Sequence, residues 1–279
     1  RQYKWSARDK EATCNVIGIF IWRGKEMKRL AFLSDCHFGA DMDLKAFGFA
    51  VKILEEIQPD RIFLGGDIWD HSAVSKYRKN PDKVVCLQKE IETGIEQLAS
   101  LVDACPTALV QLTRGNHEAR LPNFLLDTAK ALYGLEVFNP RTLYGLDDLG
   151  IEYIEKAPYK VGHLYLLHGD QVNTSGINPA KKALDDVNSS VLFGHVHKFS
   201  ESGKTQLNGR QIGAWSNGCL CTLSPDYTLQ PDWQQGFSIV DFTARGYFNV
   251  TQVRFWWDRK LRALQAFVDG MLFDSREGK

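Results

Sequence analysis

Short apolar runs alternate with amphipathic stretches along most of the chain. Five of these runs end in Gly, Asp, Asn or His, and they read RLAFLSDCHFG, RIFLGGDIWD, ALVQLTRGNHE, LYLLHGD and SVLFGHVH. Apolar runs of this length bounded by turn residues are typical of buried strands. Strands that alternate with helices indicate a layered α/β fold, so we predict one α/β domain.

The stretches between the strands have helical spacing. Residues 45–57 place their apolar side chains on one face. Asn80, followed by a proline, has the pattern of a helix N-cap and predicts a long amphipathic helix over about residues 80–103. Asn178, also followed by a proline, predicts a shorter helix. The apolar stripe of the 80–103 helix is expected to pack on the sheet, and an oligomer contact through this helix is the alternative.

The later sequence is richer in strand-forming residues. Three segments combine β-branched and aromatic residues and are separated by Pro, Asp or Gly: 216–223, 236–242 and 247–257. They are expected to form second-sheet strands, between about residues 212 and 258, that close the core. Residues 27–279 are expected to form a single domain, with residues 1–26 as an N-terminal extension of unknown role.

Composition and charge narrow the class of protein. The chain has 279 residues, 44% of them hydrophobic, with a formal net charge of zero at pH 7. A neutral chain lacks the global basic field that drives nonspecific nucleic-acid binding, although a local basic patch stays open. Six cysteines without a C-x-x-C pair are typical of reduced thiols, so we expect a cytoplasmic protein. The apolar run at residues 16–22 is too short to span a bilayer and lacks the flanks of a signal peptide, so no membrane segment is expected.

Each apolar run ends in side chains that bind metals. In chain order these are Asp35, His37, Asp67, Asn116, His168, His195 and His197. Carboxylate oxygen, imidazole nitrogen and one amide suit Mn, Fe, Zn or a similar divalent ion better than Ca or Mg alone. In D-x-H and H-x-H an extended backbone would point both side chains to one side, so that each pair grips one ion. Each motif alone is commonly structural, but five of the seven histidines fall in these strand ends.

The motifs DCHFG, GGDIWD, GNHE, HGD and GHVH, in this order, resemble the calcineurin-like metallophosphoesterase superfamily. The resemblance covers about residues 28–197 and implies a two-sheet β-sandwich flanked by helices, a four-layer α/β/β/α fold. It also implies two divalent metal ions, with Mn expected first and Fe, Zn, Ni or Mg as alternatives. Carried over by position, one ion takes Asp35, His37, Asp67 and His197, and the other takes Asp67, Asn116, His168 and His195, with Asp67 as the bridge.

The resemblance also implies a reaction. Two cations about 4 Å apart lower the pKa of a bridging water, and the resulting hydroxide attacks a phosphoryl centre. Only two of the seven ligands are formally anionic, which favours an anionic substrate. His117 matches a family histidine that stabilises the phosphoryl oxygens or protonates the leaving group, and Asp70 stands where relatives orient that imidazole. The alternative for Asp70 is an ordinary acid at a helix N-terminus, and Glu118 is expected to hold the loop.

The substrate class rests on finer features. The compact GHVH resembles phosphodiesterases and the nuclease branch that includes the Mre11 and SbcD exonucleases, and the chain also resembles phosphoesterases of phage and prophage genomes. His71, Tyr77, Arg114 and Arg120 are candidate contacts for a phosphate backbone or a base, with a solvated surface as the alternative. We expect a DNA or RNA nuclease-like phosphodiesterase in a bacterial or phage-infected cell. A phosphatase or phosphodiesterase of small phosphoesters is the alternative, and an inactive scaffold of the same fold is a third.

Overall fold

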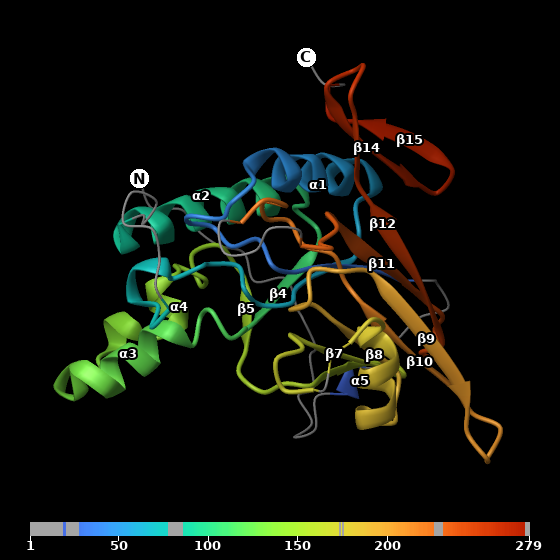
Figure 1. Ribbon diagram of the computed structural model, residues 1–279, viewed down its shortest axis with the longest axis horizontal. Helices are drawn as coiled ribbons and strands as arrows, with labels where there is room; N and C mark the ends of the chain where they lie inside the picture. The colour runs from blue at the N-terminus through green and yellow to red at the C-terminus, as the bar shows by residue number, and fades with distance from the viewer. Residues whose placement is uncertain are drawn as a thin grey trace.

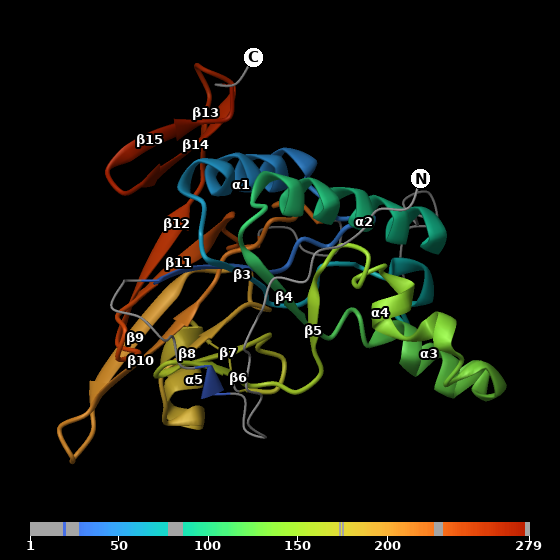
Figure 2. The ribbon, with the colours of Figure 1, turned by 180° about the vertical axis from the view of Figure 1, so that it is seen from behind.

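Two β-sheets packed face to face form the centre of the molecule (Figure 1). The computed structural model describes residues 19–20, 28–77, 86–172, 174, 176–225 and 231–276. Helices α1 and α2 cover the outer face of one sheet, and helix α5 covers the outer face of the other (Figures 1 and 2). This is the predicted two-sheet sandwich with helical outer layers.

The first sheet has the strand order β12-β11-β2-β3-β4-β5. Its strands are β2 (Lys28–Leu33), β3 (Arg61–Leu64), β4 (Leu109–Thr113), β5 (Glu152–Ile154), β11 (Gly236–Phe242) and β12 (Phe248–Arg254). Strands β2 to β5 run parallel, while β11 pairs antiparallel with both β2 and β12. Because parallel neighbours end at the same edge of a sheet, the polar segments after β2, β3 and β4 are brought side by side.

The second sheet has the strand order β1-β6-β7-β8-β10-β9. Its strands are β1 (Ile19–Phe20), β6 (Tyr159–Val161), β7 (Leu164–Leu167), β8 (Val191–Phe193), β9 (Ser200–Thr205) and β10 (Gln211–Ser216). Strands β7 and β8 are parallel and end beside each other. All five strands predicted from residues 28–197 are therefore present, three in the first sheet and two in the second.

The assignment of the later strands to a second sheet was wrong in part. Strands β11 and β12 extend the first sheet, and only β10 belongs to the second. Residues 217–223 follow β10 without forming a strand, apart from isolated bridges at Cys219 and Cys221. The period of apolar residues specifies which face of a strand is buried, but it does not specify which strand lies beside it.

A third, small sheet was not predicted. It consists of β13 (Trp256–Asp258), β14 (Ala263–Val268) and β15 (Met271–Asp274), joined as antiparallel neighbours. The sheet projects beyond α1 near the C-terminal end of the chain (Figure 1). Leu264, Ala266 and Val268 of β14 belong to the same buried core as side chains of α1. The small sheet therefore helps to cover this core together with the helix.

The cap predicted at Asn178 is confirmed, whereas the long helix begins at Leu87, later than predicted. Helix α1 (Leu44–Ile57) is capped by Asp43, whose carboxylate accepts hydrogen bonds from two backbone amides, and α5 (Pro179–Val187) is capped in the same way by Asn178. Helix α2 spans Leu87–Ala104, and the start predicted at Asn80 lies outside the described residues. The shorter helices are α3 (Arg120–Thr128), α4 (Pro140–Leu143), η1 (Ser72–Val74), η3 (Lys130–Leu132) and η4 (Glu136–Phe138). No helix in the described ranges is both long enough and apolar enough to cross a membrane.

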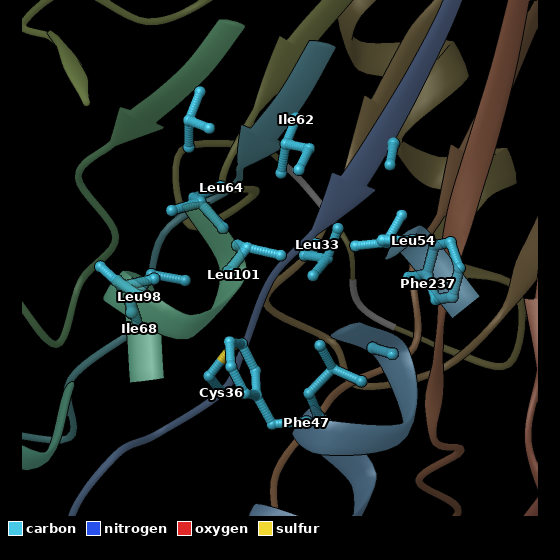
Figure 3. Close-up of a cluster of buried hydrophobic side chains, with 14 of the residues drawn as sticks. Leu33, Cys36, Phe47, Leu54, Ile62, Leu64, Ile68, Leu98, Leu101 and Phe237 are labelled. Atoms are coloured by element: carbon cyan, nitrogen blue, oxygen red, sulfur yellow. The ribbon is translucent and has the colours of Figure 1, made fainter. Parts of the chain in front are cut away.

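Strand β2 is buried on both of its faces. Ala31 and Leu33 pack into the core beneath α1 and α2, while Leu30 and Phe32 pack between the two sheets. Figure 3 shows side chains of the first core, including Leu33 and Cys36, gathered between the strands and the helices. Full burial of one Leu or Phe side chain contributes about 1.5–3 kcal/mol, so the segment that follows β2 is firmly anchored.

Candidate metal centre

The seven predicted metal ligands meet where five strands end. Each follows the carboxyl end of β2, β3, β4, β7 or β8 within four residues: Asp35, His37, Asp67, Asn116, His168, His195 and His197. The two sheets are joined here by hydrogen bonds, since His168 Nδ1 lies 2.9 Å from Gly65 O and His195 N donates to Asp35 Oδ2 at 3.0 Å. The edge of one sheet therefore faces the edge of the other across the ligands.

The backbone at these positions differs from the predicted extended form. Five ligand residues have positive φ angles: Asp35 (57°), His37 (47°), Asp67 (52°), His195 (68°) and His197 (56°). Non-glycine residues rarely adopt this left-handed conformation, which costs on the order of 1–3 kcal/mol and is concentrated at functional sites. The pairing inferred from extended geometry fails for H-x-H, because His195 and His197 point into two different groups of donor atoms.

The first group contains Asp35, His37, Asp67 and His197. His197 Nε2 lies 3.2 Å from Asp35 Oδ1 and 3.1 Å from His37 Nε2. His37 Nε2 lies 3.9 Å from Asp67 Oδ2. Three donor atoms therefore point at one small volume: Asp35 Oδ1, His37 Nε2 and His197 Nε2. Asp67 Oδ2 lies at its edge.

The second group contains Asp67, Asn116, His168 and His195. His168 Nε2 lies 3.3 Å from Asp67 Oδ2, 3.0 Å from Asn116 Oδ1 and 3.2 Å from His195 Nδ1. The same Asp67 oxygen, Oδ2, is thus close to both groups. The geometry gives Asp67 the central position that the sequence resemblance predicted for a bridging ligand.

The spacing of these donors fits divalent cations. Ligand atoms about 2.1 Å from one cation are roughly 3.0–3.4 Å from one another, and the close pairs in both groups have such separations. Nitrogen and carboxylate donors with one amide suit transition-metal ions of the Mn, Fe and Zn type. The residues present therefore fit two divalent ions.

Two glycines leave room for the carboxylates. A Cβ atom at Gly115 would lie 2.2 Å from Asp67 Oδ1, and one at Gly194 would lie 2.5 Å from Asp35 Oδ2. Neither glycine has a positive φ, so close approach rather than backbone freedom requires glycine at these positions.

The charges within the cluster shift the pKa values in opposite directions. Burial lowers the pKa of His168, but the adjacent Asp67 carboxylate outweighs it and raises the pKa to about 10. Asp35 likewise overcomes burial and raises the pKa of His197 to about 9. For Asp67, burial is opposed by His168 and His117, which hold its pKa well below the usual range. The carboxylates are therefore ionised and available to a cation, and the two imidazoles must release protons to bind one.

Glu118 holds the loop that carries the central ligand. Its buried carboxylate accepts hydrogen bonds from the backbone amides of Asp67 (3.0 Å), Ile68 (2.7 Å), Trp69 (3.1 Å) and Gly115 (2.8 Å). The ends of β3 and β4 are thereby tied together through one side chain. This agrees with the loop-holding position expected for Glu118.

His117 and Asp70 are in direct contact beside the cluster. His117 Nδ1 lies 2.8 Å from Asp70 Oδ1, and His117 Nε2 lies 3.7 Å from Asp67 Oδ2. Asp70 is fully buried two residues before the short helix η1, and its carboxylate contacts His117 and Arg120. Arg120 donates from Nη1 to Asp70 Oδ1 at 2.9 Å, and its Nη2 lies 2.8 Å from His117 Nε2. The guanidinium of Arg120 thus contacts both members of the pair.

The remaining predicted substrate contacts lie apart from the ligands. His71 is fully buried with its Nε2 3.2 Å from the Tyr144 hydroxyl, so its prediction as a substrate contact was wrong. Burial also lowers its pKa to about 4, which leaves it uncharged. Arg114 and Tyr77 are exposed, and within the described ranges neither makes a hydrogen bond, ion pair or ring contact with a ligand candidate.

Several supporting residues were missed by sequence reasoning. The carboxylate of Glu90, on α2, accepts hydrogen bonds from the backbone amides of His71 and Ser72, which anchors the segment directly after Asp70. Tyr144 stacks on Trp69 with ring centroids 3.8 Å apart. The Trp233 ring lies 4.2 Å from that of His197, centroid to centroid. These residues are distant in sequence from the motifs, so no local pattern marks them.

Comparison with known proteins identifies the family. The sequence model of the calcineurin-like phosphoesterase family matches residues 28–205, well over half of the chain. This chain belongs to the calcineurin-like phosphoesterase family, a family of metal-dependent hydrolases.

Individual relatives are distant. The chain is similar to the Gene 54 protein of Mycobacterium phage D29, with 24% identity over 226 residues that cover 76% of this chain and 88% of that protein. Among solved structures it is similar to Yfce, a phosphoesterase from E. coli, with 15% identity, a TM-score of 0.38 and coverage of 80% of this chain and 98% of that one. It is also similar to TT1561 of Thermus thermophilus, with 10% identity, a TM-score of 0.35 and coverage of 81% and 99%. The family assignment depends on the sequence match, not on these structural similarities.

Proposed function

We propose that this chain is a phosphodiesterase that hydrolyses nucleic-acid phosphodiester bonds with two divalent cations. The observation that carries the proposal is the convergence of seven donor side chains in two groups that share Asp67 Oδ2. Asp35, His37, Asp67 and His197 would hold one cation, and Asp67, Asn116, His168 and His195 would hold the other. Two such cations supply an activated water and neutralise the charge of the phosphoryl group. Mn is the expected metal.

His117 is the proposed acid for the leaving group. Its Nδ1 donates to Asp70 Oδ1 at 2.8 Å, and this hydrogen bond fixes the ring so that Nε2 faces the cluster. Nε2 accepts from Arg120 Nη2 at 2.8 Å, so this guanidinium must move aside before a proton carried on Nε2 can pass to the oxygen that leaves the phosphorus. Asp70 stabilises the imidazolium by its negative charge, in the same way that a buried carboxylate orients other catalytic histidines.

The position of Arg120 indicates whether the substrate is a phosphodiester or a phosphomonoester. A monoester carries a second negative charge, and phosphatases that bind it commonly use a guanidinium as a clamp. The guanidinium that contacts this cluster, that of Arg120, is already bound to the side-chain and backbone oxygens of Asp70 and lies against His117. His71, directly after Asp70, is buried and cannot supply a replacement. This arrangement favours a singly charged diester.

Small phosphoesters or nucleotides remain the second candidate. The formal net charge of zero gives the chain no global attraction for a polyanion, which favours a small substrate. The compact H-x-H pair and the exposed Arg114 and Tyr77 favour nucleic acid.

Turnover of matched substrates tests the proposal. With Mn present, we expect bis-p-nitrophenyl phosphate to be hydrolysed faster than p-nitrophenyl phosphate, and labelled single- or double-stranded DNA to be cleaved. Faster turnover of the monoester, with DNA intact, would assign the second candidate. If no substrate turns over while two metal ions are bound, the chain is the inactive scaffold and the proposal is wrong.

A further inference from the structure

The side of His197 that faces away from the proposed cations contacts a thiol. His197 Nε2 points into the first donor group, 3.2 Å from Asp35 Oδ1. Its other ring nitrogen, Nδ1, lies 3.8 Å from Cys221 Sγ, within hydrogen-bonding range for sulfur. Both side chains are buried, with His197 only 6% exposed and Cys221 fully enclosed, so bulk water does not compete at Nδ1.

The backbone around Cys221 is fixed to the metal centre. Leu220 N donates to Asp35 O at 3.0 Å, which connects this segment to the ligand loop after β2. Cys221 O accepts a hydrogen bond from Gln235 Nε2 at 2.8 Å, and Cys221 forms an isolated bridge with Met42. The backbone at Cys221 is therefore held by contacts that do not involve His197.

A metal-binding histidine needs a partner on its second nitrogen. Such a partner fixes the tautomer and the ring orientation, and its removal typically weakens metal binding about 10–100-fold. His168 in the second group has a partner of the usual kind, since its Nδ1 lies 2.9 Å from the backbone oxygen of Gly65. At His197 the corresponding position is occupied by sulfur.

We propose that Cys221 is a positioning residue that orients His197 for the cation of the first donor group. The thiol sulfur accepts the Nδ1 hydrogen of His197 and leaves Nε2 unprotonated and directed at Asp35 and His37. The inference rests on the proposed metal centre but does not depend on which phosphoester is the substrate.

The competing hypothesis is that the Cys221 thiol binds the cation directly. Cys221 Sγ and ring nitrogens of His37 and His197 all lie within 4.8 Å of one another, which is compatible with a shared ion. The sulfur, however, lies next to Nδ1 of His197, whereas the close contacts to Asp35 and His37 are made by Nε2. One imidazole ring cannot direct both nitrogens at the same cation, so the geometry favours positioning.

The test is metal affinity in the full chain, measured by isothermal titration of Mn into chelator-treated protein. We expect wild type to bind two ions, and Cys221→Ala to bind one of them about 10–100-fold more weakly. Cys221→Ser keeps an acceptor at the same position and should recover part of the loss. Cys105→Ala is the matched control, because Cys105 is also buried but lies in the core beneath α1 and α2, and we expect it to stay within about twofold of wild type.

Other outcomes overturn the inference in distinguishable ways. Unchanged affinity in Cys221→Ala, or an equal loss in Cys105→Ala, would show that Cys221 has no specific role in positioning. When cobalt(II) is bound to wild type, we expect no sulfur-to-metal charge-transfer band. If wild type shows such a band and Cys221→Ser lacks it, Cys221 is a metal ligand and not a positioning residue. If wild type binds no Mn, the proposed metal centre itself fails.

Discussion

At the scale of single residues, the cluster separates the side chains proposed to hold cations from those proposed to act on the substrate. Asp67 has one oxygen near both donor groups, and its other oxygen accepts the His117 backbone N–H at 2.7 Å. The His117 ring is held by Asp70 on its Nδ1 side, and its Nε2 lies 3.7 Å from Asp67 Oδ2. Loss of either side chain should abolish turnover, but for different reasons.

Asp67→Asn should lose metal, whereas His117→Ala should keep it. The neutral amide removes the shared anionic donor, so we expect fewer than two Mn ions per chain after desalting. His117→Ala should retain both ions while kcat falls about 10²–10⁴-fold, the usual contribution of a proton-transfer group. Metal content by mass spectrometry and turnover of the diester measure the two effects. An empty metal position in His117→Ala would show that the role assigned to His117 is wrong.

Arg120→Ala distinguishes a positioning role from a substrate contact. Arg120 binds Asp70 and His117, so its removal should lower kcat with little change in KM for the diester. The loss should be smaller than that of His117→Ala, roughly tenfold, because the imidazole remains. Steady-state kinetics provide the measurement. A rise in KM at constant kcat would instead support the phosphate contact predicted from the sequence.

At the scale of elements, α2 packs closely against residues 69–72, the segment that follows β3. Trp69, two residues beyond the central ligand, lies over α2 where the helix carries Gly94, and Glu90 of the same helix binds the backbone of His71 and Ser72. The long helix therefore supports the site through close contacts at two of its own residues. The sequence predicted the helix and its buried stripe, but not these contacts.

Gly94→Ala and Gly48→Ala should change stability in opposite directions. A Cβ atom at Gly94 would lie 1.9 Å from Trp69 Nε1, and the resulting overpacking should cost about 1–3 kcal/mol. Gly48 lies in α1 with no atom within 4 Å of its added Cβ, so helix propensity alone should stabilise the variant by about 0.5–1 kcal/mol. Urea unfolding of both variants is the measurement. Equal stabilisation would contradict the tight contact between α2 and Trp69.

Glu90 should make stability depend on pH. Burial raises its pKa to about 7, against the hydrogen bonds from His71 and Ser72. Because the folded carboxyl holds its proton more tightly than the unfolded one, this contribution is complete below about pH 4.5 and is lost as pH rises through about 7. Glu90→Gln should therefore gain on the order of 1–3 kcal/mol relative to wild type between pH 5 and pH 8. A difference in unfolding free energy that stays constant over this range would contradict the prediction.

At the scale of the whole molecule, the metal centre joins the two sheets. Three of its strand ends belong to the first sheet and two to the second, and the donors converge only when the sheets are packed. A cation that binds the folded state alone therefore stabilises the sandwich as a unit.

Chelation should lower the melting temperature. A ligand present at 100 times its Kd stabilises the folded state by about 2.7 kcal/mol, which corresponds to roughly 5–10 °C for a chain of this size. We expect EDTA to lower Tm by such an amount and excess Mn to restore it, as measured by calorimetry. Asp67→Asn should show a much smaller response. An EDTA effect of equal size in that variant would place the stabilising metal elsewhere.

The sequence by itself determined the strand-end motifs, the layered fold and the seven candidate donors that the structure brings together. Apolar runs need burial, and polar residues at the carboxyl ends of parallel strands share one edge, so these features follow from local pattern. His117 and Asp70 lie within the GNHE and GGDIWD motifs, and their roles were predicted from the family resemblance.

Only the tertiary structure decided how the parts meet. The left-handed backbone at Asp35 and His197 and the addition of β11 to the first sheet depend on which strands become neighbours. The burial of His71 and the contact of Cys221 with His197 also require segments that are distant in sequence to pack together. Hydrophobic periodicity specifies which faces are buried, whereas partners, register and side-chain contacts are fixed by packing of the whole chain.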